Sequence, residues 1–321
     1  MSAAAPPRVR RGQTLGIVAP AGPVDVDRMK RGLARLGEAF ELRIADNIFA
    51  ERSPNVPSYL AASDAARAAE LNAMLADPDV RGIVLARGGY GLMRILDELD
   101  AASLVRDPKP IVGFSDATAL LAWAHHLGVR GIHGPMAVQL GDLPAEDVAH
   151  LVAMLSEPRV PGLRPWFLAS HGTGVHRGPL VPANLTLASM LVGSPWPLPL
   201  AGAIALFEEV GERPYELDRY LTQLSLTGAI AETRAVIVGE LLRCWPQLCS
   251  RCTDAGPPAG GTDADDAALF TVLERLAAAD LPAASGAPVG HGTRNEAVPF
   301  GAACVLDLDH HTIEITEAAV A

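Results

Sequence analysis

The residue of this chain best placed to act as a nucleophile is a serine. Ser115 lies within Pro110–Thr118, where a short apolar, β-branched run gives way to a helical pattern. A tight turn between a buried strand and a helix exposes a hydroxyl above the sheet edge, and a helix N-terminus stabilises negative charge nearby. The backbone N–H of Asp116 would point to the position where an oxyanion forms. We therefore take Ser115 as the candidate nucleophile.

A purely structural role for the same serine stays open on these residues alone. Serine is a favoured helix N-cap. The stretch Gly113–Ala117 also lacks the last glycine of the nucleophile-elbow pattern. The turn must therefore be judged together with the rest of the chain.

A glycine-rich turn precedes this serine along the chain. Arg87–Gly91 reads Arg-Gly-Gly-Tyr-Gly and follows a predicted buried strand. Glycines allow a backbone to approach a ligand closely and expose its N–H groups. The spacing is not that of a dinucleotide fingerprint, and an ordinary strand-to-helix turn remains the alternative.

An acid and a base that could complete a triad lie in the second half of the chain. Glu208 and Glu209 end a predicted strand, and neighbouring side chains on a strand face opposite sides, so only one can reach an imidazole. His291 lies between Gly290 and Gly292, where the backbone could aim it, although a histidine between glycines is also typical of an ordinary loop. A triad is recognised by geometry and not by spacing.

Three of the four cysteines are close in sequence. Cys244, Cys249 and Cys252 are separated by four and then two residues, which matches the start of a plant-type iron–sulfur spacing. The fourth, Cys304, is distant and lies in a strand-like segment. We favour free thiols in and beside a surface loop over an iron–sulfur or zinc site, and we expect no metal and no cofactor.

Strand and helix patterns alternate through the first half of the chain, with short connections. This alternation is typical of a parallel sheet covered by helices on both faces. The predicted strands are 15–19, 42–44, 82–86, 110–114 and 131–133, and the predicted helices are 27–40, 63–77, 91–99 and 116–127.

The second half has a more mixed pattern. Strands are predicted at 203–207, 235–242 and 303–308, helices at 185–191, 214–225 and 265–278, and a surface loop at 252–266. We predict an α/β protein with an N-terminal α/β domain over 1–157, a Pro-, Gly- and His-rich linker over 158–182, and a β-rich mixed C-terminal domain over 183–321.

The composition and charge of the chain argue against nucleic-acid binding and against a membrane span. The net charge of −11 repels phosphate backbones, so nucleic-acid binding would need a basic patch, and none is present in the sequence. No apolar run approaches the roughly 18 residues of a membrane span. The N-terminus has no charged segment followed by an apolar stretch, so we expect a cytoplasmic protein.

Several separate motifs in the same order resemble the LD-carboxypeptidases, a family of serine peptidases. They are GIVAPAGPV, RGGYGLMRILDELD, KPIVGFSDATALLAWAHHLG with IHGP, ALFEEVGERPYELDRYLTQLSLTG, and VGHGTRNEAVPFG. The resemblance extends from about Leu15 to about Leu308. It implies an N-terminal α/β domain, a C-terminal β-rich domain, a homodimer and no metal.

The resemblance also assigns roles to individual residues. Ser115 would be the nucleophile, His291 the general base, and Glu208, rather than Glu209, the acid that orients the imidazole. The backbone N–H groups of Gly89 and Asp116 would form the oxyanion hole. Tyr90 and Asn184 are the candidate substrate-binding residues. Pro182 and Ala183 replace two glycines usual in the family before Asn184, and 244–266 is longer than usual.

The expected substrate of such an enzyme is a small peptide. We predict release of a C-terminal D-amino acid from a cytoplasmic murein tetrapeptide through an acyl-enzyme. A branch that resembles the microcin C immunity peptidases cleaves peptidyl- or aminoacyl-nucleotide conjugates, and Trp166, Phe167 or Trp196 could stack on a base. A generic esterase and a non-catalytic small-molecule binding protein are further alternatives.

Overall fold

The computed structural model describes residues 3–244 and 262–321, and these divide into two compact units. Unit 1 contains residues 1–162, 293–303 and 315–321, and unit 2 contains residues 163–292 and 304–314. Both units are of the α/β class, with a parallel sheet in the first and a larger mixed sheet in the second. This confirms the predicted fold class.

Unit 1 is built on a six-stranded sheet in the order β12-β5-β4-β3-β1-β2. Strands β1 to β5 are parallel, and β12 adds to β5 in the antiparallel sense. Its elements are β1 (Thr14–Val18), α1 (Val26–Gly37), β2 (Glu41–Ile44), η1 (Asp46–Ile48), α2 (Asp64–Ala76), β3 (Val80–Leu85), η2 (Leu92–Arg94), η3 (Leu96–Glu98), α3 (Ala101–Arg106), β4 (Ile111–Gly113), η4 (Ser115–Ala117), α4 (Thr118–His126), β5 (Ile132–His133), α5 (Ala137–Leu140), α6 (Ala145–Ser156) and β12 (Val298–Pro299).

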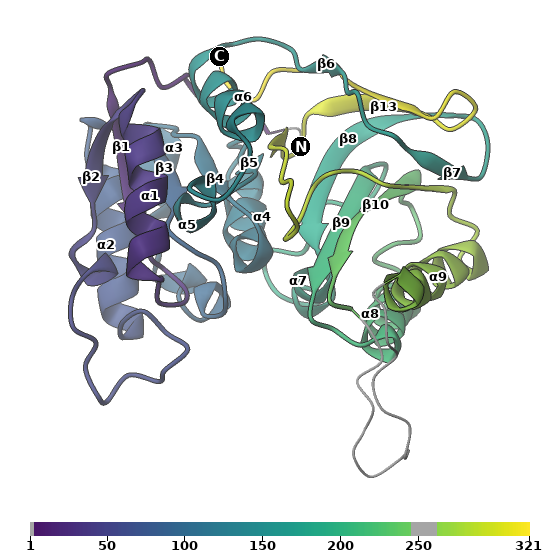
Figure 1. Cartoon of the computed structure of the whole chain (residues 1–321), viewed down its shortest axis with the longest axis horizontal. Coiled ribbons are helices and arrows are strands. Elements are labelled where there is room, and N and C mark those ends of the chain that lie inside the picture. Colours follow the sequence, from purple (N-terminus) through teal and green to yellow (C-terminus); the bar gives the residue numbers. More distant parts are fainter. Residues whose placement is uncertain (1–2, 245–261) are drawn as a thin grey trace. The chain divides into compact units, whose positions relative to one another are not determined.

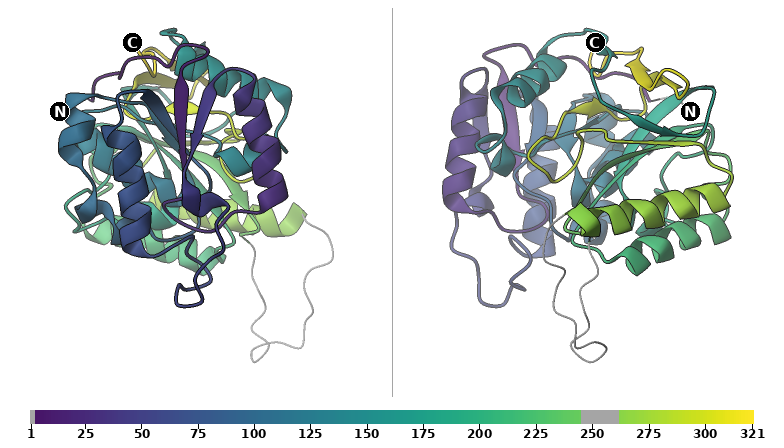
Figure 2. Two further views of the ribbon diagram at one scale, coloured as in Figure 1. Left: turned by 90° about the vertical axis from the view of Figure 1, so that its left-hand side faces the viewer. Right: turned by 45° about the vertical axis from the view of Figure 1, so that its right-hand side comes forward.

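Helices cover both faces of this sheet. Helix α1 lies on one face and α2 and α3 on the other (Figure 1, Figure 2). Helix α1 begins after Asp25, whose carboxylate accepts the backbone N–H of Arg28 at 2.8 Å, and it buries Met29, Leu33 and Leu36 at helical spacing. The central strands are buried on both sides, which explains why they read as continuous apolar runs.

Unit 2 contains an eight-stranded sheet in the order β6-β14-β13-β8-β9-β10-β11-β7. Its helices α8 and α9 run side by side over the sheet (Figure 2). The elements are β6 (Gly162–Leu163), β7 (Ala169–His171), β8 (Val175–Asn184), α7 (Leu185–Met190), β9 (Ile204–Val210), α8 (Pro214–Leu226), β10 (Ala235–Leu242), α9 (Thr262–Ala278), β11 (Ala283–Ser285), β13 (Ala303–Asp307) and β14 (Thr312–Ile315).

One predicted helix is wrong. The segment 91–99 forms two 3₁₀ turns, η2 and η3, with hydrogen bonds from residue i+3 to residue i, such as Arg94 N to Gly91 O at 3.2 Å. The backbone cannot enter an α-helix at Gly91, whose φ is +132°. Side chains from elsewhere in the unit instead hold the peptide that follows Gly91.

Part of the predicted surface loop over 252–266 lies outside the described residues, as do Cys249 and Cys252. Cys244 and Cys304 are free and buried, and burial raises the pKa of each thiol to about 12. Among the residues that the structure describes, no group of three His, Cys, Asp or Glu side chains could hold a metal ion.

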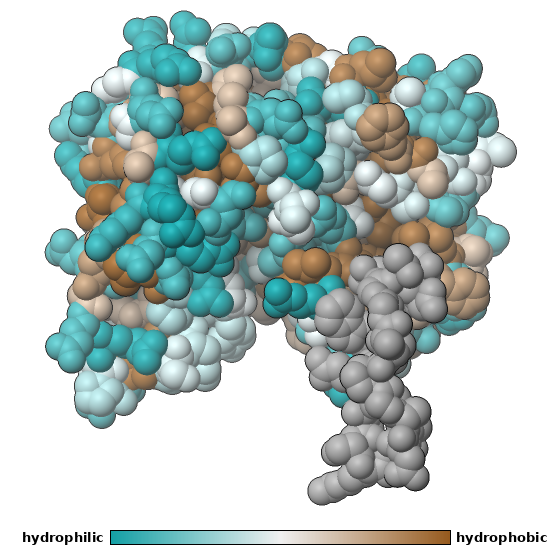
Figure 3. Space-filling view, in the orientation of Figure 1, coloured by the Kyte–Doolittle hydropathy of each residue, from teal (hydrophilic) through white to brown (hydrophobic). Residues whose placement is uncertain are grey.

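Within 3–244 and 262–321, none of the helices has both the length and the apolar character needed to cross a bilayer. On the face drawn in Figure 3, hydrophilic residues are interspersed with separate hydrophobic patches.

Candidate active site

Ser115 lies where β4 ends and helix α4 is about to begin. Its φ is +60°, a left-handed conformation that costs a residue with a side chain roughly 1–3 kcal/mol and that clusters at functional sites. Phe114 is the residue before the 3₁₀ turn η4 and Ala117 the residue before α4, so Ser115 caps neither. The strained backbone at Ser115 is of the kind that a nucleophile elbow requires, and the N-cap interpretation is wrong.

The turn at Ser115 can form without the last glycine of the nucleophile-elbow pattern because Gly113 faces Ala117, which stands in its place. A Cβ added at Gly113 would lie 2.7 Å from the Cβ of Ala117, closer than real contacts allow. The close approach of strand and turn is therefore provided by Gly113, and alanine fits at 117. A departure from the sequence pattern thus leaves the local geometry intact.

The glycine turn 87–91 lies against this serine within unit 1. Strands β3 and β4 are neighbours, so the turns that follow them meet at the carboxyl edge of the sheet. A Cβ at Gly88 would be 3.1 Å from the Ser115 Cβ and 3.2 Å from its Oγ. Gly89 has a φ of +113°, and Tyr90, half-exposed at 49%, packs edge-to-face on Tyr59 with ring centroids 5.8 Å apart.

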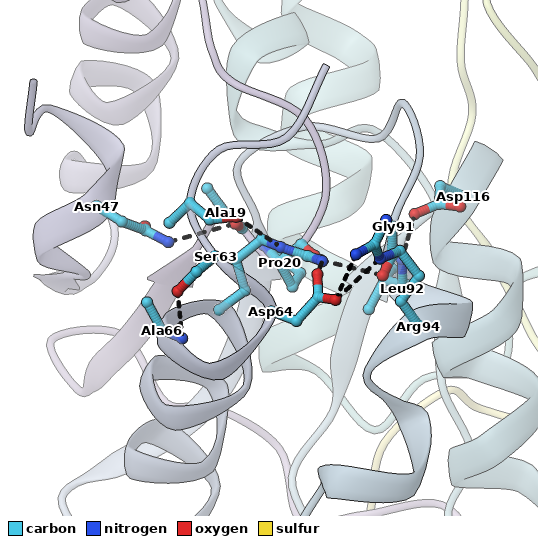
Figure 4. A network of polar contacts seen from close by, with 12 residues as sticks. Ala19, Pro20, Asn47, Ser63, Asp64, Ala66, Gly91, Leu92, Arg94 and Asp116 are labelled. Atoms are coloured by element: carbon cyan, nitrogen blue, oxygen red, sulfur yellow. Dashed lines mark hydrogen bonds and ion pairs between the residues drawn. The ribbon is translucent and has the colours of Figure 1, made fainter. Parts of the chain in front are cut away.

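Asp116, the residue after the serine, is almost completely buried, with 2% of its surface exposed. Its carboxylate accepts the backbone N–H of Leu92 at 2.9 Å, as Figure 4 shows. Burial raises the pKa of this carboxyl to about 6, against the opposing effects of the Leu92 and Gly91 N–H groups and the Arg67 charge. The side chain of Asp116 therefore joins the serine turn to the glycine turn.

In unit 2 the structure brings Glu208 and His291 together. Glu208 is completely buried on β9, and its Oε2 lies 2.7 Å from Nδ1 of His291, whose side chain is 18% exposed. A carboxylate only accepts, so Nδ1 carries the proton and Nε2 is left with its lone pair. Burial lowers the pKa of His291, but the charge and hydrogen bond of Glu208, together with the charges of Glu209 and Glu240, outweigh burial and raise it.

The glycines around His291 have a steric reason. A Cβ at Gly290 would lie 3.1 Å from the Glu240 Cβ and 3.2 Å from the Glu208 Cβ, and one at Gly292 would overlap the Glu240 carboxylate. The absence of side chains at 290 and 292 thus lets this turn lie close to the strands that carry Glu208 and Glu240. Glu240 on β10, which also raises the pKa of His291, was missed by the sequence reasoning.

Glu209 faces away from the imidazole and forms hydrogen bonds at the start of helix α7. Its carboxylate accepts hydrogen bonds from Asn184 Nδ2 at 2.8 Å, Thr186 N at 2.8 Å, Thr186 Oγ1 at 2.7 Å and Val210 N at 2.8 Å. Burial, followed by the neighbouring Glu208 charge, raises its pKa to about 7. Asn184, a predicted substrate-binding residue, is 3% exposed and caps α7 through the N–H of Leu187 at 3.2 Å.

Comparison with known proteins identifies the family. The model of the LD-carboxypeptidase N-terminal domain matches residues 15–134, and that of the C-terminal domain matches 177–306. Together they cover more than half of the chain, which belongs to the LD-carboxypeptidase family. It is therefore a serine-type carboxypeptidase, a hydrolase of peptide bonds.

The similarity to relatives and to a solved structure extends over nearly the whole chain. A probable murein peptide carboxypeptidase of Bacillus subtilis is 29% identical over 98% of this chain and 95% of its own. The murein tetrapeptide carboxypeptidase of Pseudomonas aeruginosa is 29% identical over 91% and 92%. The fold matches that of the microcin C7 self-immunity protein MccF, solved in complex with glutamyl sulfamoyl guanosine, at a TM-score of 0.82, 22% identity, and 99% coverage of both chains.

Proposed function

We propose that this protein releases a C-terminal D-amino acid from a murein tetrapeptide, using Ser115, Glu208 and His291 as its triad. The observation that carries the proposal is that a chain of this family has both a strained serine turn in unit 1 and a hydrogen-bonded Glu208–His291 pair in unit 2. The named activities of the Bacillus and Pseudomonas relatives support the murein peptide as substrate. We further propose a cytoplasmic location and a homodimer, as the family resemblance implies.

The proposed chemistry begins with proton transfer. Nε2 of His291 takes the proton of the Ser115 hydroxyl as Oγ attacks the carbonyl before the terminal D-residue, and the negative Glu208 stabilises the resulting imidazolium. The backbone N–H groups of Gly89 and Asp116 donate to the oxyanion. His291 then returns the proton to the leaving amine, and water releases the acyl group from Ser115 by the reverse sequence.

The first experiment uses the purified protein and the tetrapeptide L-Ala–D-Glu–diaminopimelate–D-Ala, with products followed by mass spectrometry. Release of D-Ala is expected from the native chain and from Ser225→Ala, which alters an exposed serine on α8. It should be lost in Ser115→Ala. A peptide ending in L-Ala should remain intact. Failure of the native protein to release D-Ala would remove murein tetrapeptide as the substrate.

An aminoacyl-nucleotide conjugate is the second candidate substrate. Two observations favour it: MccF, which shares the fold, is solved in complexes with glutamyl sulfamoyl guanosine and aspartyl sulfamoyl adenosine, and Phe167 is 97% exposed on this chain. An exposed aromatic ring can stack on a nucleobase, whereas Trp166 is buried at 6%. Hydrolysis of an aminoacyl sulfamoyl adenosine, reduced by Phe167→Ala, would support this second activity.

A further inference from the structure

Two buried, oppositely charged side chains hold one peptide group of the glycine turn. The carbonyl of Gly91 accepts a hydrogen bond from an Nη of Arg67 at 3.0 Å. The N–H of the next residue, Leu92, donates to Oδ2 of Asp116 at 2.9 Å, and Figure 4 labels both residues. These are the two polar ends of the same peptide bond. Arg67 is 1% and Asp116 2% exposed. Hydrogen bonds to charged groups in such surroundings are the stronger ones.

The guanidinium of Arg67 is itself fixed on all sides. Its remaining bonds go to the backbone carbonyls of Pro20 and Ala62 and to the carboxylate of Asp64. Asp64 also pairs with Arg94 at 2.6 Å on the turn that follows Gly91 (Figure 4). Arg67 therefore connects helix α2 and the turn after β1 to the glycine turn.

Gly91 is required by this arrangement. Its φ of +132° is open mainly to glycine. A Cβ there would lie 2.9 Å from Nη1 of Arg67 and 2.7 Å from the Leu60 side chain. Because Gly91 has no side chain, the guanidinium of Arg67 can reach its carbonyl. The residue that gives the backbone its freedom is therefore also the one that Arg67 restrains.

The other end of the turn is held as well. The backbone N–H of Gly22 donates to the carbonyl of Gly88 at 3.1 Å. Gly22 thus holds the 88–89 peptide, which carries the Gly89 N–H, from one side, and Arg67 and Asp116 hold the 91–92 peptide from the other. An unrestrained glycine backbone would sample many conformations, and an oxyanion donor contributes only if it is already in place.

We propose that Arg67 and Asp116 are positioning residues that align the N–H of Gly89 for catalysis. The inference rests on the proposed function, in which the N–H groups of Gly89 and Asp116 stabilise the oxyanion. Asp116 then has two parts in the same site: its own backbone N–H is one donor, and its carboxylate fixes the turn that carries the other. Arg67 supplies an opposite charge that counteracts the effect of burial on the pKa of this carboxyl.

The test compares Asp116→Ala, Asp116→Asn and Arg67→Met with the native protein. The asparagine retains an oxygen that can accept the Leu92 N–H, whereas alanine removes it. Because loss of one oxyanion donor lowers kcat about 10²–10³-fold, we expect kcat of Asp116→Ala and Arg67→Met to fall by about 10-fold to 10²-fold with KM nearly unchanged. Asp116→Asn should recover most of the loss.

Lys109 provides a matched control. It is a fully buried cation in the same unit that donates to the Met74 carbonyl at 3.2 Å, but it precedes β4, at the opposite end of the strand from Ser115. Lys109→Met should lower the unfolding temperature and leave kcat within about twofold. An equal fall in kcat for Lys109→Met, or a native kcat in Asp116→Ala, would overturn the positioning role.

A second readout separates this inference from the proposed substrate. A fluorophosphonate phosphonylates an activated serine without needing the peptide, and the labelling rate of Ser115 can be followed by intact mass. We expect the rates to rank native, then Asp116→Asn, then Asp116→Ala, even if the tetrapeptide is not cleaved. Identical labelling rates in folded variants, or no labelling of the native Ser115, would contradict the inference.

Discussion

Two adjacent glutamates in this protein have different roles because a strand points them in opposite directions. Glu208 reaches the imidazole of His291, and Glu209 accepts four hydrogen bonds near the start of α7. The alternation predicts that only one of them can contact a histidine, but it does not say which. The choice made from the family resemblance, Glu208, is the one that contacts His291.

The charge of Glu208 should be visible in the pH dependence of activity. A general base works when neutral, and because Glu208 raises the pKa of His291, activity should rise with pH through a value above that of an ordinary histidine. In Glu208→Gln the charge is lost and burial dominates, so the acid limb of kcat/KM should move to lower pH. The plateau of kcat should fall by about 10³-fold or more.

The exposed Glu232 offers the control for this profile. Glu232→Gln removes one negative charge from the same unit without contacting His291, so its acid limb should coincide with that of the native protein. Profiles of kcat/KM measured from pH 5 to 9 decide the matter. An unshifted limb in Glu208→Gln would mean that Glu208 does not act on the titrating base.

Strands and helices position the site through close backbone approaches at glycines. Periodicity predicts where most elements lie, as β1, α1, β3 and β9 illustrate. It does not reveal that Gly239 of β10 faces the backbone of Val289, because this contact joins residues that are 50 positions apart in the chain. For the same reason, periodicity could not predict that Glu240 lies beside His291 or that Arg67 lies beside Gly91.

Gly239→Ala should therefore disturb the turn that carries His291 from a neighbouring strand. A Cβ at 239 would lie 2.5 Å from the carbonyl oxygen of Val289, two residues before His291. A backbone atom cannot rotate away as a side chain can. We expect a loss of about 1–3 kcal/mol in the free energy of unfolding and a lower kcat, measured by urea unfolding and by steady-state kinetics.

Gly37, at the end of helix α1, has open space around its Cβ position. Gly37→Ala should leave kcat unchanged and stabilise the protein by a few tenths of a kcal/mol to about 1 kcal/mol, because alanine is the better helix residue. If Gly239→Ala is as active and as stable as Gly37→Ala, the close approach of β10 to the turn has no functional importance.

At the scale of the whole chain, unit 1 is completed by segments from the far end of the sequence. Strand β12 pairs with β5, and Phe300 N donates to Gly131 O at 2.9 Å. The C-terminal Ala321 exchanges backbone hydrogen bonds with Pro6 and Arg8 at 2.8 and 2.9 Å. Such short segments carry no periodicity of their own, so their return to the first unit could not be predicted from the sequence.

A fragment of residues 1–162 should consequently fail to fold stably. It would expose the edge of β5 and the apolar surface that now buries Val298, Phe300 and Val320. Thermal unfolding followed by circular dichroism should show no cooperative transition, or one well below that of the full chain. Joining residues 293–303 to the fragment through a flexible linker restores the partner of β5 and should raise the midpoint. A bare fragment that unfolds cooperatively at the temperature of the full chain would show that the returning segments are dispensable.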